Sequence, residues 1–270
     1  LMNVLRQNSF TMIIACGITM IIICGKTDLS AGAVCCLGGC IGVDFYIKTG
    51  SVSAAFGMAI AVGLIAGFCN GAMVALFNLP AFIATLATQI ICKGVVLIYT
   101  GGWPIYNLGN ITVLGKGYWP IVFIVIFLAI TWFILNRTRY GRHIYATGGN
   151  AEVATASGIK TKRVLISTFM LCSVFSSIAG VLLMCRLTSA APTAASGLEF
   201  EAIIGAIVGG TSFSGGIGTI GGTMVGCLIM GLINNILNLL GVQSYYHQVI
   251  RGLLIAFTVI YDINMKNKKK

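Results

Sequence analysis

The chain has 270 residues, a formal net charge of +11, 57% hydrophobic residues and only 9% charged residues. Its mean hydropathy of +0.97 lies far outside the range of soluble globular proteins, and several uncharged runs are long enough to cross a bilayer. Ten of the seventeen basic residues lie at 137–163 and 266–270, which membrane topology and anionic lipid explain better than nucleic acid does. The composition therefore predicts an all-α, polytopic transmembrane helical bundle.

Five membrane spans are expected before the longest polar interruption of the chain. The first uncharged run ends at a polar, glycine-containing break over residues 25–32, and Pro80 divides a second long uncharged stretch. Residues 101–118 contain the turn-forming pairs Gly-Gly and Trp-Pro and are expected to form a loop. The predicted spans are 7–25, a run ending at Val43, 52–77, 80–99 and 119–136.

Residues 137–163 form the polar interruption, with six Lys or Arg residues and the single acid Glu152. Basic loops between spans stay in the cytoplasm, so this loop fixes the orientation of the chain. The turn signal at 148–150 is followed by small residues at 151–157, and Gly158 is a helix-terminating residue. We therefore expect a short cytoplasmic helix over 151–157.

Four spans are expected after the loop. Residues 164–185 form one, and the uncharged stretch 202–250 has the length of about two, divided by the glycine-rich residues 209–218. The last runs over about 245–263. A short span near 200–210 is needed to return the lysine-rich tail to the cytoplasm. The sequence thus predicts about nine spans, with residue 1 outside the cell and one further span upstream in a parent protein of about ten.

Several motifs that suggest chemistry are better explained by packing. Residues 24–27 resemble the end of a phosphate-binding loop, but Met20 stands where its first glycine is required. Residues 216–221 match a dinucleotide fingerprint without a βαβ unit. His143 and His247 have no ligand-spaced partners, so neither a metal site nor a cofactor is expected. Glycines spaced by four residues at 63–71 and 222–226 predict close contact between spans.

Polar residues inside apolar runs are the candidates for a polar path, because ionisable groups in a bilayer usually face the bundle interior or water. Asp28 with Ser30 is expected to line or stabilise the interior. Lys93 and Arg251 are expected to extend toward the outer surface. Glu199 and Glu201 are expected on a solvated face at the outer end of a span.

Four sequence blocks together resemble the membrane subunits of bacterial ABC sugar importers, in the ribose, galactose and xylose branch. The blocks spread over nearly the whole chain in the family order. They are TDLSAG at 27–32, NG at 70–71 with LPAFIATL at 79–86, GRHIYATGGN at 141–150 with SGI at 157–159, and EFEA at 199–202 with IVGG at 207–210. Lys26, Val153 and Thr155 depart from residues that are frequent in the family.

This resemblance implies a single transmembrane permease domain over residues 1–270, in a bacterial inner membrane, with a cytoplasmic coupling loop at 137–163. The implied partners are a second permease copy or homologue, two cytoplasmic ATPase subunits, an external sugar-binding protein and membrane lipid. No catalytic residue and no nucleic acid are implied. The residues expected to couple to the ATPase are Gly141, Arg142, Gly148, Asn150, Glu152, Ala154 and Gly158, and those expected on the translocation path are Asp28, Ser30, Asn70, Thr85 and Gln89.

Two other classes of protein stay open from the residues alone. A secondary transporter driven by an ion gradient could use the broken stretches 25–32 and 209–222 as its site, although the scarcity of buried carboxylates weighs against it. A membrane enzyme is the third class, but no nucleophile, metal or acid–base constellation emerges. The sugar, and whether the two permeases are identical, do not follow from the sequence.

Overall fold

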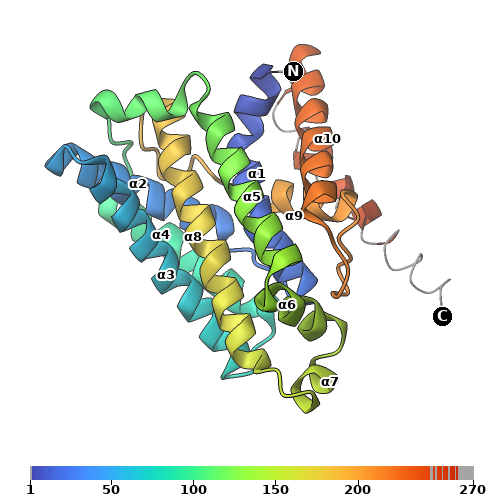
Figure 1. Cartoon of the computed structure of the whole chain (residues 1–270). Coiled ribbons are helices and arrows are strands. Elements are labelled where there is room, and N and C mark those ends of the chain that lie inside the picture. The colour runs from blue at the N-terminus through green and yellow to red at the C-terminus, as the bar shows by residue number, and fades with distance from the viewer. Residues whose placement is uncertain are drawn as a thin grey trace.

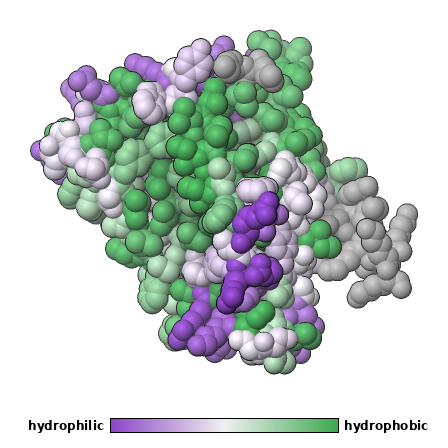
Figure 2. All heavy atoms as spheres, in the orientation of Figure 1, coloured by the Kyte–Doolittle hydropathy of each residue, from purple (hydrophilic) through white to green (hydrophobic). Residues whose placement is uncertain are grey.

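In the computed structural model, seven helices within the described part of the chain are long and apolar enough to cross a membrane. The structure describes residues 2–243, 246, 248–250, 252–254, 256–258 and 260. Figure 2 shows apolar atoms over the middle of the visible face and hydrophilic atoms gathered mainly toward its two ends. The seven helices are α1 (Met2–Ile23), α2 (Ala31–Thr49), α3 (Val52–Ala75), α4 (Ala81–Thr100), α5 (Trp119–Arg137), α8 (Thr161–Leu187) and α10 (Ile220–Leu239).

The prediction of about nine spans is therefore too high for the described residues. The predicted short span near 200–210 is α9 (Leu198–Val208), whose 11 residues reach only about 16 Å, half of the hydrocarbon thickness. The predicted last span at 245–263 lies partly, and the tail at 266–270 wholly, outside the described residues. The other predicted spans correspond to the seven helices, and the all-α class is confirmed.

The glycine-spaced helix α3 packs closely against α8, as Figure 1 shows. A Cβ atom built on Gly67 would lie 2.5 Å from Cα of Met170, and one on Gly71 would lie 2.6 Å from Cα of Ile166. On α10, a Cβ on Gly226 would lie 2.0 Å from the backbone oxygen of Gly205. Only glycine allows backbones to approach this closely, so the predicted packing role of these motifs is confirmed.

Two membrane segments begin with a non-helical stretch and continue as a helix. Residues 24–30 lead into α2, and residues 188–197 lead into α9. The starts of the two helices meet inside the bundle. There the backbone N–H of Ala195 donates to Sγ of Cys36 at 3.2 Å, and a Cβ on Gly32 would lie 2.0 Å from Oε2 of Glu199. Their amino-terminal ends are therefore gathered at one point of the core.

The remaining elements lie at the two ends of the bundle. The short helices α6 (Arg139–Gly149) and α7 (Ala151–Ala156) lie at one end, below α5 and beside the lower part of α8 in Figure 1. The 3₁₀ helix η1 (Gly109–Gly115) lies at the other end, together with the start of α1. There, Ile105 and Ala190 exchange two backbone hydrogen bonds of 3.0 and 2.8 Å. The basic loop and the amino-terminal segment thus lie on opposite membrane faces.

Candidate functional site: a capped helix, its junction and a polar core

The short helix α7 is stabilised at its start by the side chain of Asn150. The backbone N–H groups of Glu152 and Val153 donate to Oδ1 of Asn150 at 3.0 and 3.1 Å. Such a cap satisfies two of the amide groups that a helix start leaves free and contributes about 1 kcal/mol. Asn150 therefore determines where α7 begins.

The end of α7 is closed by Gly158, which has a φ of +84°. The N–H of Ile159 donates to the carbonyl of Ala154 at 3.0 Å, and the N–H of Gly158 donates to that of Thr155 at 2.9 Å. This pair of bonds is a Schellman motif, which favours glycine at the left-handed position. The predicted stop at Gly158 is confirmed, with the helix ending at Ala156 rather than Ser157.

Helix α7 presents an exposed face at the end of the molecule. Glu152 is exposed and the Val153 side chain is 61% exposed, whereas Ala154 is buried on the inner face. With both ends capped, six residues hold a fixed shape that an isolated peptide of this length would not keep. The arrangement suits a surface that transmits force to or from a partner.

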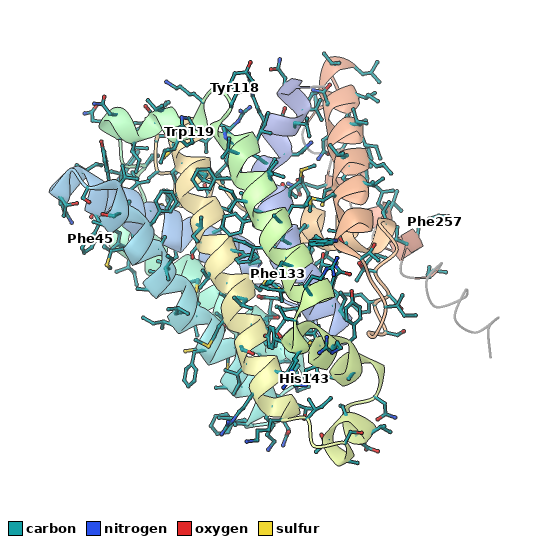
Figure 3. The ribbon with its side chains drawn as sticks, viewed as in Figure 1. Phe45, Tyr118, Trp119, Phe133, His143 and Phe257 are labelled. Carbon is teal, nitrogen blue, oxygen red and sulfur yellow. The ribbon has the colours of Figure 1, made fainter. Side chains whose placement is uncertain are left out.

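The neighbouring helix α6 is anchored to the transmembrane bundle on three sides. Gly141 is buried against α5, where an added Cβ would lie 2.3 Å from the backbone oxygen of Ile134. The hydroxyl of Tyr140 lies 2.7 Å from Oγ of Ser167 and 2.9 Å from Oγ1 of Thr168 on α8. Burial raises the pKa of the Tyr140 phenol, so the group stays a neutral hydrogen-bonding hydroxyl. Arg142 is exposed, and Figure 3 marks its neighbour His143 on the same short helix.

The third side of α6 forms a junction with the end of α1 and the loop at 209–219. A Cβ on Gly148 would lie 1.6 Å from the backbone oxygen of Ile23, so only glycine fits there. The same oxygen accepts a hydrogen bond from the N–H of Gly216 at 2.8 Å. Tyr145 donates from its hydroxyl to the carbonyl of Gly218 at 2.7 Å. The basic loop is thereby bonded to segments more than sixty residues away along the chain.

Nothing in the sequence indicates the contact made by Tyr145. The glycine-rich stretch 209–218 predicts a divider between spans, and nothing in its composition points to a tyrosine on another helix. The junction becomes visible only when α6, α1 and the loop are placed together (Figure 1).

Three of the predicted path residues form one buried network. Oγ of Ser30 donates to Oδ1 of Asp28 at 2.6 Å, and Nδ2 of Asn70 donates to Oγ of Ser30 at 2.8 Å. All three side chains are inaccessible to solvent. Oδ1 of Asn70 accepts no hydrogen bond from any described residue, and Oδ2 of Asp28 has no hydroxyl, amide or amine donor among them, although the thiol of Cys172 interacts with the Asp28 carboxyl. Two acceptors are therefore left in the core for a donor such as water or a polar solute.

The other two predicted path residues lie apart from this network. The hydroxyl of Thr85 donates to the backbone oxygen of Ala81 at 2.8 Å, within its own helix. Nε2 of Gln89 donates to Oε1 of Glu199 at 2.7 Å and so links α4 to the start of α9. The pair borders a cavity of about 470 Å³ that is also lined by Lys93 and Phe200. Polar side chains of α4 and α9 thus face this cavity.

The expectation of a solvated face for Glu199 and Glu201 is wrong. Glu199 is 1% exposed and Glu201 is 6% exposed. Oε1 of Glu201 accepts a hydrogen bond from Nδ2 of Asn234 at 3.2 Å, and its Oε2 accepts one from Oγ1 of Thr11 at 3.4 Å. Because α9 starts inside the bundle, its first-turn acids lie in the core, where the helix amino terminus favours negative charge. The predicted position of Arg251 lies outside the described residues.

Comparisons with known proteins place this arrangement in a family. Residues 1–259 match the family described as "Branched-chain amino acid transport system / permease component". The "Ribose import permease protein RbsC" of Escherichia coli (strain K12) is 37% identical over 283 residues, which cover 100% of this chain and 86% of that protein. The protein of the same name from Bacillus subtilis (strain 168) is 39% identical over 97% of this chain and 84% of its own length.

A third relative carries a different name. The "Galactose/methyl galactoside import permease protein MglC" of Haemophilus influenzae is 33% identical over 99% of this chain and 87% of that protein. No solved structure matches the chain significantly. The relatives are import permeases, so the comparisons support an ABC importer subunit and do not support the alternative of an ion-driven transporter.

Proposed function

The chain belongs to the family of branched-chain amino acid transport system permease components, and from this membership we propose that it forms the membrane path of an ATP-driven monosaccharide importer. It is a multi-pass protein of a bacterial inner membrane, of a type that typically does no catalysis. Permeases of such importers work with an ATPase and a solute-binding protein. In our proposal these are two cytoplasmic ATPase subunits and one external sugar-binding protein, and a second permease copy or homologue completes the path.

The coupling residues of this proposal are those of α6 and α7. The exposed face around Glu152 and Val153 would contact the ATPase, while Asn150, Ala154 and Gly158 would keep the helix rigid enough to transmit movement. Gly141 and Gly148 would hold α6 against the bundle, and Arg142 would extend toward the partner from the same surface. A rigid element that is anchored to the bundle and exposed on its other face suits this role.

The junction is the structural observation that carries the coupling part of the proposal. The hydrogen bond from Tyr145 to Gly218 connects α6 to the loop before α10, and the one from Gly216 to Ile23 connects that loop to α1. The same loop follows α9, whose first turn carries Glu199. A displacement of α7 would therefore be passed through α6 to α1 and to the glycine-rich loop. From there it would reach the polar core through contiguous backbone contacts.

The path of the proposal includes Asp28, Ser30, Asn70, Thr85 and Gln89. Sugars present many hydroxyl groups, and the acceptors Oδ2 of Asp28 and Oδ1 of Asn70 could each receive one. Because these side chains are inaccessible to solvent within the single chain, they belong in our proposal to a closed section of the path. Movement of α1 and α9 would open it by separating the starts of α2 and α9.

Uptake into proteoliposomes tests the proposal directly. The chain would be purified together with its ATPase, reconstituted into proteoliposomes and supplied with binding protein. The proteoliposomes should accumulate a labelled monosaccharide, from a panel that includes ribose and galactose, when ATP is present on the side of the membrane that the ATPase faces. Uptake should stop without ATP, and it should not be restored by a proton or sodium gradient. Accumulation driven by an ion gradient alone would contradict the proposal.

A further inference from the structure

A cationic cavity lies at the end of the bundle opposite α7. Arg6 of α1, Lys116 after η1 and Arg186 of α8 line an open cavity of about 610 Å³, together with the amide side chains of Asn3, Gln7 and Asn235. No acidic side chain is among the described residues that line it. The basic loop 137–163 lies on the other membrane face, so topology does not account for these three cations.

The three cations have no ion-pair partner among the described residues, in contrast to Lys48. That lysine lies at the same end of the bundle and pairs with Asp44 at 2.6 Å. The guanidinium of Arg6 stacks 5.6 Å from the ring centroid of Tyr118, and its buried Nε has no hydrogen-bond acceptor. A buried donor beside two further unpaired cations favours a negatively charged ligand that brings its own acceptors.

An apolar groove continues from the cationic cavity. It shares Lys116 and Gly117 with that cavity and is otherwise lined by Val113, Tyr118, Trp119 and Val122. Val113 is 55% exposed and Val122 is 42% exposed. Figure 3 marks Tyr118 and Trp119 at the start of α5, where an aromatic pair is typical of the membrane–water interface. The groove therefore begins at the headgroup level and runs along the first turn of α5, toward the hydrocarbon region.

We propose that the cavity of Arg6, Lys116 and Arg186 and the adjoining groove bind one anionic phospholipid. The phosphodiester would lie among the three cations, the three amides would bond the polar headgroup, and one acyl chain would follow Val113 and Val122. A free phosphate would leave the groove empty. A zwitterionic lipid would add the positive charge of its own headgroup to a cavity that already holds three cations. This inference is independent of the sugar and of the ATPase.

The amount of lipid that the purified protein retains tests the proposed site. The full chain would be purified in detergent and titrated with dioleoylphosphatidylglycerol or dioleoylphosphatidylcholine, with bound lipid counted by native mass spectrometry. Each basic residue near an anionic lipid strengthens the binding of that lipid. The double variant Arg6→Gln with Arg186→Gln should therefore bind phosphatidylglycerol on the order of tenfold more weakly. The single variant Lys116→Gln, on an exposed loop, serves if the double variant folds poorly. Lys48→Gln, whose cation lies outside the cavity, is the matched control and should bind as the parent does.

The groove is tested separately with Val113→Ser and Val122→Ser. These variants should weaken binding of phosphatidylglycerol and leave binding of inorganic phosphate unchanged. Equal retention of both lipids, or unchanged retention by the cation variants, would overturn the proposal. So would full displacement of the lipid by inorganic phosphate. If the cation variants instead weakened only the binding of an external protein, the cavity would be a docking site for an acidic protein surface, and the lipid assignment would be wrong.

Discussion

Replacing Tyr145 by phenylalanine removes one hydroxyl from the junction and little else. The hydroxyl donates to the carbonyl of Gly218 at 2.7 Å, and the ring of Tyr145 stays half-buried in α6. A hydrogen bond of this kind contributes about 1 kcal/mol net, which corresponds to about a fivefold change in an equilibrium. We therefore expect the link between α6 and the loop 209–219 to weaken without loss of the fold.

The assay is the ratio of sugar imported to ATP hydrolysed in proteoliposomes. If the junction transmits force, Tyr145→Phe should lower this ratio by about fivefold while hydrolysis continues, because ATPase movement would no longer reach the loop reliably. The ratio separates coupling from a general loss of protein, which would lower both rates together.

Tyr140→Phe provides the matched control for this experiment. This variant also removes one tyrosine hydroxyl from α6, but the Tyr140 hydroxyl bonds Ser167 and Thr168 of α8 rather than the loop. We expect a lower thermal midpoint and an unchanged transport ratio. If both variants imported the normal amount of sugar per ATP hydrolysed, or if both lowered this ratio equally, the junction would not be the route of coupling.

Three further changes test other contacts. Gly158→Val would place a β-branched residue at a φ of +84°, at a cost of about 1–2 kcal/mol; uptake should fall while membrane insertion, measured by fractionation, is retained. Gly67→Leu should lower the thermal midpoint strongly because a Cβ there would lie 2.5 Å from Met170, whereas Gly57→Leu, which meets no atom within 4 Å, should not. In a double-mutant cycle, Gln89→Ala and Glu199→Ala together should destabilise less than their sum by about 1–2 kcal/mol, because each alone leaves a buried group unpaired. Additive effects would mean that this pair is not coupled.

Local signals in the sequence were sufficient for the short helix and the packing seam. Asn150 and Gly158 act through bonds to residues within five positions, and Gly63, Gly67 and Gly71 share a helix face whatever their partner is. Long uncharged runs also located the seven spanning helices. These features depend on neighbours along the chain, which a single sequence contains.

Contacts between distant segments could not be predicted in the same way. Glu199 is buried because α9 starts inside the bundle, and its partner Gln89 is 110 residues away. An apolar run near 200–210 has the same composition whether it crosses the membrane or begins halfway through it. The junction of Tyr145 with Gly218 depends on the same three-dimensional arrangement, so neither the polar core nor the coupling route follows from composition alone.

Photo-crosslinking from α7 tests the proposed coupling surface most directly. A benzoylphenylalanine introduced at Val153, which is 61% exposed, would be compared with the same group at Val113, which is 55% exposed on the opposite face. In membranes that contain the whole importer, we expect the probe at 153 to crosslink to the ATPase and the probe at 113 not to do so. An ATPase crosslink from position 113 and none from position 153 would contradict the proposed coupling surface.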